Sequence, residues 1–165
     1  MNVLVTGANG QLGNEMRLMA QNSSHHYIFT DVEELDITDF NAILQTVKEK
    51  EIQIIVNCAA YTNVDKAEND FDTANALNNI AVGRLANVAK AQNATLIHIS
   101  TDYVFNGNNH IPYTEDDITD PIGVYGKTKL AGEETIKKVG CNYIILRTAW
   151  LYSKWGNNFV KTMQK

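Results

Sequence analysis

Short apolar segments alternate with amphipathic segments along this chain, and this alternation constrains the fold more than any other feature. Five segments have the length and composition of buried strands, and helical spacing of apolar residues fills the stretches between them. Such alternation favours an α/β fold with a doubly wound parallel sheet, because parallel neighbours need crossover connections and these are right-handed. The expected strands are residues 2–6, 27–30, 52–57, 95–100 and 143–147.

The expected helices follow from apolar periodicity and from capping residues. Thr38 or Asp39 has the side chain to cap the second helix, whose apolar stripe runs from Phe40 to Val47. Residues 106–123 are polar and contain both prolines, which predicts a long loop. The other expected helices are residues 10–21, a short one near 64–69, a long one at 72–92, 125–138, and one that includes 157–161.

Composition limits the classes of function. The 165 residues suit one sizeable core, and a net charge of −5 argues against nucleic acid as the main partner. No apolar run approaches the roughly 18 residues of a membrane helix, and the first ten residues lack the features of a signal peptide, so we expect a cytoplasmic protein. The isolated Cys58 and Cys141 suggest no zinc site, and we expect free thiols.

A glycine-rich turn follows the first expected strand. Gly7, Gly10 and Gly13 have GxxGxxG spacing, and Gln11 and Leu12 lie inside this segment. Glycine permits a tight turn that brings the backbone close to a pyrophosphate, and the helix that starts near Gly10 directs free N–H groups at the phosphates. The position of this turn between a strand and a helix favours nucleotide binding over an ordinary glycine turn.

Carboxylates follow the second expected strand. Asp31 could accept hydrogen bonds from the adenosine ribose and would repel a 2′-phosphate, which favours NADH over NADPH; a surface or capping aspartate is an equally good interpretation. Asp36 could bind the adenine amine, with Ile37 against the ring, or it could cap the next helix.

The segment after the third expected strand has small residues that could let a cofactor lie against the backbone. This segment continues from Cys58 as Ala59, Ala60, Tyr61 and Thr62. Tight packing of strand on helix would explain these small residues equally well.

Tyr125 and Lys129 form a YxxxK pattern at the start of a helix, on one face. A nearby ammonium lowers the pKa of a phenol, so Tyr125 could donate a proton near neutral pH while Lys129 reaches a ribose hydroxyl. Thr101, at the end of the fourth strand, is preferred over Ser100 as the hydroxyl that binds a substrate carbonyl, because successive strand residues point to opposite faces. Asp102 could bind a sugar hydroxyl or cap the turn.

These residues resemble those of the extended short-chain dehydrogenases/reductases, and within them the family of dTDP-4-dehydrorhamnose reductases. The similarity runs through nearly the whole chain, and the combination of its last three motifs is specific. The stretches that carry it are VTGANGQLG (5–13), VNCAAYTNVDKAE (56–68), STDYVFNG (100–107), VYGKTKLAGE (124–133) and RTAWLY (147–152).

The resemblance implies that NADH or NADPH reduces the C4 keto group of dTDP-4-dehydro-L-rhamnose, giving dTDP-L-rhamnose for cell-surface polysaccharide synthesis. Tyr125 would protonate the alkoxide, Lys129 would tune Tyr125 and hold the nicotinamide ribose, and Thr101 would orient the carbonyl. Asp102 and Trp150 would contact the sugar. The implied cofactor contacts are Gly10, Gln11, Leu12, Asp31, Asp36, Ile37, Ala60, Tyr61 and Thr62.

Family membership carries further expectations about the whole protein. Members continue well past residue 165 with a domain that grips the thymidine nucleotide, so residues 1–165 would be the Rossmann-like NAD(P)-binding domain of a longer chain. The family is also associated with Mg²⁺ and a homodimer, although the sequence contains no evident cluster of metal ligands.

Two other functions remain open from sequence. One is another nucleotide-sugar enzyme of the same fold, an epimerase or a 4,6-dehydratase; the dehydratases carry Asp-Glu after the catalytic threonine, whereas Asp102 is followed here by Tyr103. The other is a non-catalytic regulatory subunit of the methionine adenosyltransferase type, against which the intact Tyr125, Lys129 and Thr101 argue. We interpret His98, on the fourth strand, as a packed residue.

Overall fold

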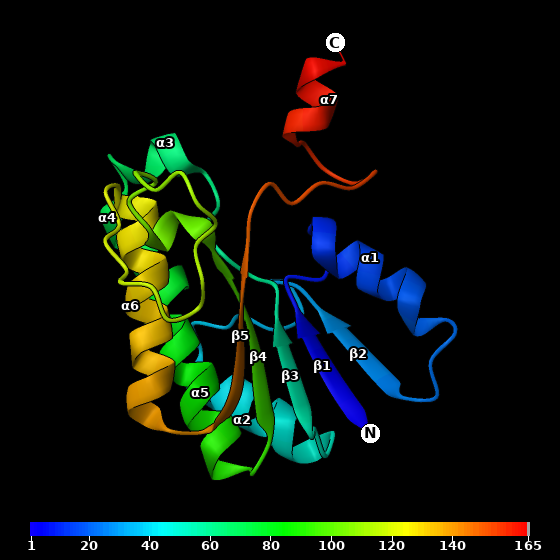
Figure 1. Cartoon of the computed structure of the whole chain (residues 1–165). Coiled ribbons are helices and arrows are strands. Elements are labelled where there is room, and N and C mark those ends of the chain that lie inside the picture. Colours follow the sequence, from blue (N-terminus) through cyan, green and yellow to red (C-terminus); the bar gives the residue numbers. More distant parts are fainter. Residues whose placement is uncertain (165) are drawn as a thin grey trace.

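The computed structural model describes residues 1–164 and contains five parallel strands (Figure 1). Their spatial order is β2-β1-β3-β4-β5, and every neighbouring pair is parallel. This order is one of the common doubly wound arrangements, so the expected fold class is confirmed. The strands are β1 (Asn2–Thr6), β2 (His26–Thr30), β3 (Ile54–Asn57), β4 (Thr95–Thr101) and β5 (Asn142–Thr148).

The larger part of the hydrophobic core lies on the face of the sheet that is covered by α2 (Phe40–Glu49), α5 (Ala81–Ala91) and α6 (Val124–Val139). Leu4, Ile55 and Leu96 point from three strands into this core and are fully buried. They belong to one cluster with Ile43 of α2, Val47 of α2, Leu85 of α5 and Ile136 of α6.

Within residues 1–164, α1 (Gln11–Ala20) is the helix that covers the opposite face of the sheet (Figure 1). Met16 of α1 packs on Val3, Val5 and Val56, so α1 protects the side of the sheet formed by β1 and β3. Burial of strand side chains is therefore incomplete towards β5, where Ile144 and Leu146 remain 49% and 47% exposed.

The long helix expected over residues 72–92 is interrupted by a π-helical turn. The chain forms α4 (Phe71–Asn75), the π turn η1 (Ala76–Ile80) and then α5. The side chain of Asn78, in the π turn, donates to the carbonyl of Tyr61 and to the hydroxyl of Thr128, at 3.1 Å in both cases. Gly132 of α6 packs so closely here that a Cβ would lie 2.2 Å from the Asn78 carbonyl oxygen. These tertiary contacts explain why periodicity alone did not predict the π turn.

The remaining elements agree with the expected organisation. Asp39 caps α2 by accepting from the backbone amides of Asn41 and Ala42, and residues 106–123 form an irregular loop. Three short helices complete the chain, α3 (Val64–Ala67), the 3₁₀ turn η2 (Asp102–Val104) and α7 (Phe159–Met163).

After β5 the chain crosses back over the carboxyl edge of the sheet towards α1 before it enters α7 (Figure 1). Asn158 connects this segment to α1, because its Nδ2 donates a hydrogen bond of 2.9 Å to Gln11 Oε1. Cys58 and Cys141 are both free thiols, and burial raises the pKa of Cys58 to about 12. No helix within residues 1–164 has the combined length and apolar character needed to cross a membrane.

Candidate active site

A cavity of about 960 Å³ opens at the carboxyl ends of the strands. The chain leaves β1 towards β2 and leaves β3 in the opposite direction towards β4, and ligands bind at such a switch point in doubly wound sheets. The cavity is lined by these residues predicted from sequence: Gly7, Gly10, Gln11, Leu12, Asp31, Asp36, Ile37, Ala59, Ala60, Thr62, Thr101, Asp102, Tyr125, Lys129 and Trp150.

The turn between β1 and α1 has the form of an anion cradle. Gly7 has a left-handed φ of 64°, and a Cβ there would lie 2.6 Å from the backbone of Ala59, so only glycine fits. Gly10 caps α1 without a side-chain hydrogen bond, and the first turn of α1 has no acidic residue. The free N–H groups and the positive end of the helix dipole can therefore accept a phosphate.

Two residues predicted to bind the cofactor do not line the cavity. Gly13 faces the turn that follows β1, where a Cβ would lie 2.5 Å from Ala8 Cα, so this glycine allows α1 to pack closely against that turn. Tyr61 donates from its hydroxyl to Asp70 at 3.1 Å, and its backbone amide donates to Asn78 Oδ1 at 2.9 Å. Gly13 therefore serves close packing of the helix, and Tyr61 anchors its loop.

The carboxylate of Asp31 lies at the end of β2 and belongs to the cavity wall. One of its oxygens accepts from the amide of Asn9 at 2.8 Å, and the other accepts from the amide of Val32 at 2.9 Å. Each oxygen keeps a further lone pair, because a carboxylate offers about four acceptor positions. Asp31 can therefore hold the glycine turn and still accept from a ribose hydroxyl.

Asp36 does not cap α2, which was one of its two expected roles. It accepts from the amide of Thr38 at 2.7 Å, and its hydrogen bonds with Thr38 lower the pKa of the Asp36 carboxyl. Asp36 is thus an anion at neutral pH on the same cavity wall as Ile37, whose side chain is 95% buried. Adenine recognition by this pair remains a prediction.

Tyr125 lies at the first turn of α6 and meets Thr101 from the end of β4. Burial raises the pKa of Tyr125, a hydrogen bond with Thr101 opposes this shift, and the charge of Asp102 reinforces it. The expectation that the pKa of Tyr125 is lowered is wrong, because burial raises it and Lys129 is not among the groups that shift it. A raised pKa keeps Tyr125 a neutral phenol at physiological pH, which is the form that donates a proton.

Lys129 is buried beneath the cavity with only 2% of its surface exposed. Its Nζ donates to the carbonyl of Ile99 at 2.6 Å and lies 3.4 Å from Nε2 of His98. Burial lowers the pKa of Lys129 from 10.5 to about 8, while the negative charge of Glu133 acts in the opposite direction. Lys129 can therefore gain or lose a proton close to neutral pH.

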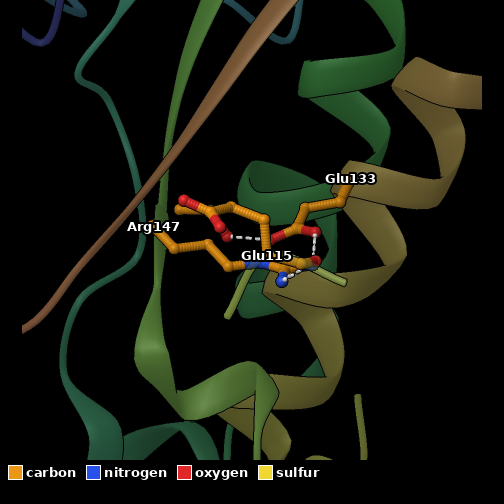
Figure 2. Close-up of polar contacts among 4 residues, drawn as sticks. Glu115, Glu133 and Arg147 are labelled. Atoms are coloured by element: carbon orange, nitrogen blue, oxygen red, sulfur yellow. Dashed lines mark hydrogen bonds and ion pairs between the residues drawn. The ribbon is translucent and has the colours of Figure 1, made fainter. Parts of the chain in front are cut away.

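A buried ion pair joins the three elements that surround this end of the site (Figure 2). Glu133 of α6 is fully buried and accepts two hydrogen bonds from Arg147 of β5, at 2.7 and 3.0 Å. Ser100 of β4 donates to the same carboxylate at 2.5 Å. Figure 2 also shows Glu115, whose carbonyl oxygen accepts from Arg147. Since Ser100 points to Glu133 and its neighbour Thr101 lines the cavity, this cluster fixes the strand that presents Thr101.

Two residues expected to contact a sugar lie at the open side of the cavity. Asp102 accepts from the hydroxyl of Thr101 at 3.0 Å. Trp150 is 69% exposed and has a φ of 52°, and its ring meets Phe159 edge to face at 4.6 Å. Trp150 is therefore a surface aromatic on the cavity wall and not a core tryptophan.

Several residues around the site were missed by the sequence reasoning. The segment after β5 supplies Gly156, Asn157 and Asn158 to the cavity wall. No local pattern marks these residues, because they reach the cavity through the return of the chain towards α1. Two polar residues beneath the cavity, Asn57 and Glu133, were also not predicted. A polar residue at the end of a buried strand or in the buried stripe of a helix is unusual, and this signal could have identified both.

Comparison with known proteins agrees with this geometry. The profile of the RmlD substrate binding domain matches residues 1–165. The chain belongs to this family. The dTDP-4-dehydrorhamnose reductase of Aggregatibacter actinomycetemcomitans is 41% identical over 98% of this chain and 55% of its own length. The chain spans about half the length of the curated relatives it matches.

Solved structures of the family superpose closely on this chain. A dTDP-4-dehydrorhamnose reductase from Clostridium acetobutylicum has a TM-score of 0.95 and 47% identity, over 99% of this chain and 58% of that one. The Bacillus anthracis enzyme, solved in complex with NADP, has a TM-score of 0.95 and 43% identity over the same shares. Within residues 1–164 no three His, Cys, Asp or Glu side chains cluster as metal ligands, so we assign no residue to the Mg²⁺ suggested by the family resemblance.

Proposed function

We propose that the protein containing this chain is an NAD(P)H-dependent oxidoreductase that reduces the C4 keto group of dTDP-4-dehydro-L-rhamnose. The product would be dTDP-L-rhamnose, used in cell-surface polysaccharide synthesis. The observation that carries this proposal is that Thr101, Tyr125 and Lys129 gather at one end of a cavity whose other end is the Gly7–Gly10 cradle. The family relatives named as dTDP-4-dehydrorhamnose reductases support the choice of substrate.

The residues present fit a nicotinamide dinucleotide. The uncapped start of α1 would hold the pyrophosphate, and Asp31 would accept from the adenosine ribose. Ala59, Ala60 and Thr62 would lie along the cofactor, since they line the cavity between its two ends. When bound, NADH or NADPH supplies the hydride.

The chain's own residues would supply and control the proton. Tyr125 is a neutral phenol and would donate its proton to the oxygen that develops negative charge at C4. Thr101 would hydrogen-bond the same oxygen and orient the carbonyl. Lys129, with a pKa of about 8, would bind the nicotinamide ribose and restore the proton of Tyr125.

The open side of the cavity would receive the sugar. Asp102 could accept from a sugar hydroxyl, and the exposed face of Trp150 could stack on the pyranose ring. By family resemblance we also propose a homodimer and a cytoplasmic location; the first is testable by sedimentation.

A turnover assay with the complete gene product tests this function. The protein would be mixed with dTDP-4-dehydro-L-rhamnose and either NADH or NADPH, and the loss of nicotinamide absorbance would be followed together with formation of dTDP-L-rhamnose. Consumption of cofactor with stoichiometric product supports the proposal. Cofactor binding without turnover would instead favour a non-catalytic regulatory role.

A further inference from the structure

A network of buried hydrogen bonds leads from the core of the sheet to the amine of Lys129. Thr6 donates from its hydroxyl to Asn57 Oδ1 at 2.7 Å, and Asn57 Nδ2 lies 3.1 Å from His98 Nδ1. His98 Nε2 in turn lies 3.4 Å from Lys129 Nζ. The side chains of these four residues are at least 98% buried, so no water competes for their hydrogen bonds.

The orientation of the Asn57 amide is fixed by a backbone group. The amide N–H of Ala59 can only donate, and it lies 3.2 Å from Asn57 Oδ1. The atom that accepts from Ala59 and Thr6 must be the oxygen, so the NH₂ group of Asn57 is the one that faces His98.

The tautomer of His98 follows from this orientation. Burial, together with the charge of Lys129, holds the pKa of His98 well below its usual 6.5, so the imidazole is neutral and carries one N–H. Nδ1 accepts from Asn57, and the single proton therefore resides on Nε2. His98 thus directs an N–H at the amine of Lys129.

This geometry suits one protonation state of Lys129 better than the other. An ammonium has three N–H groups and no lone pair, so beside Nε2–H two donors would face each other. A neutral amine donates one N–H to Ile99 and offers its lone pair to His98. The ionisable groups on the surrounding elements are Tyr125 and Glu133 on α6, Asp102 on η2, and Arg147 on β5, which pairs with Glu133.

We propose that His98 is a positioning residue that stabilises the deprotonated amine of Lys129 by donating from Nε2–H to Nζ. Its role in catalysis rests on the proposed reductase function. After Tyr125 gives its proton to the substrate oxygen, an N–H bond of the Lys129 ammonium breaks and the phenol O–H bond forms again. The amine that remains is buried and accepts from His98, until a proton from solvent restores the ammonium.

Nitrogen NMR of the ring-labelled histidines tests the first step directly. In the complete gene product at pH 7, we expect His98 to show a protonated Nε2 and a bare Nδ1, which differ strongly in chemical shift. A protonated Nδ1 would overturn the inference, whether or not the protein is a reductase. Conversely, an inactive protein with a protonated Nε2 would contradict the proposed function and leave this geometry standing.

The substitution Asn57→Asp reverses the polarity of the hydrogen-bond network with a side chain of the same shape, and it also adds a buried negative charge. A carboxylate accepts from Thr6, from Ala59 and from His98, so the imidazole proton should move to Nδ1 and Nε2 should become an acceptor for the ammonium. We expect the pKa of Lys129, followed by NMR of its Cε and Nζ, to rise by about one pH unit or more. The alkaline limb of kcat against pH should move up with it.

Thr6→Val is the matched control, because it removes a donor from the same hydrogen-bond network but leaves the hydrogen bond between Asn57 and His98. It should keep the proton on Nε2 and leave the pH profile in place. An unchanged pH profile in Asn57→Asp would overturn the proposal, because neither the new tautomer of His98 nor the new carboxylate would then act on Lys129.

Discussion

The backbone amide of Asn9 donates a hydrogen bond of 2.8 Å to the carboxylate of Asp31. This bond joins the glycine turn after β1 to the end of β2, and it holds a negative charge at the wall of the cavity. Because Val32 donates to the second oxygen, the carboxylate cannot turn away without losing two hydrogen bonds. A fixed anion at this position should influence which nicotinamide cofactor is preferred.

Asp31→Asn should shift the preference from NADH towards NADPH. The substitution removes the charge that would repel a 2′-phosphate, and it keeps an oxygen that can accept from Asn9. We expect the ratio of kcat/KM for NADPH over NADH to rise by about ten-fold, as for one charge pair near a protein surface. Asp36→Asn is the control, and a ratio that changes equally in both variants would contradict a specific role for Asp31.

Arg147→Met should destabilise the chain, because it leaves the buried Glu133 carboxylate without its guanidinium partner. Loss of one partner of a buried ion pair costs about 3 kcal/mol of stability. Because Arg147 is partly exposed, we expect the free energy of unfolding to fall by that amount or less. The double variant Arg147→Met/Glu133→Leu should recover most of the loss. Urea unfolding measures both, and a double variant less stable than the single one would show that the pair stabilises the fold beyond mutual neutralisation.

Gly132→Ala should lower stability by about 1–3 kcal/mol, since the new methyl group would overlap the Asn78 carbonyl and force α6 away from the π turn. Gly83→Ala is the matched helical control, because a Cβ there meets only the side-chain methyl of Thr135. Thermal unfolding should therefore show a much larger loss for Gly132→Ala. Equal melting temperatures would mean that α6 can shift without cost.

Lys129→Met should change how stability depends on pH. Burial lowers the pKa of Lys129 from 10.5 in the unfolded chain to about 8 in the folded one, so folding is opposed by a buried charge below pH 8. Between these two values the folded protein loses the proton first, and the free energy of unfolding rises with pH. The variant should gain up to about 3 kcal/mol at pH 7, and the gain should shrink as the pH rises through this window. Urea unfolding at pH 7 and pH 10 measures the gain in stability of the variant over the wild type. If Lys129 were not buried as an ammonium, this gain would be the same at both pH values.

The elements and much of the cavity wall could be predicted from sequence because their signals are local. β1 has the predicted bounds, and the carboxyl ends of the other four strands lie within one residue of the prediction. The spacing of Gly7 and Gly10, and the placement of Tyr125 four residues before Lys129, are likewise local. In a parallel sheet the strand ends share one edge, so these separate motifs were expected to meet.

The parts that escaped prediction depend on contacts between distant segments. The π turn reflects the approach of Gly132 to Asn78, 54 residues apart in the sequence. Glu133 gained its importance only when β4 and β5 placed Ser100 and Arg147 beside it. The pKa of Tyr125 was misjudged because spacing placed Lys129 on its face, whereas tertiary packing directs the amine to Ile99. Sequence spacing defines which residues can meet, but burial decides what they bind.

Transfer of deuterium from C4-labelled NADPH in the complete gene product tests the central claim most directly. With dTDP-4-dehydro-L-rhamnose, mass spectrometry and NMR should find the label on C4 of the sugar, and Tyr125→Phe should bind NADPH normally but lower kcat by about 100-fold or more. Absence of the label at C4, or an unchanged kcat in Tyr125→Phe, would contradict a reductase in which this phenol supplies the proton.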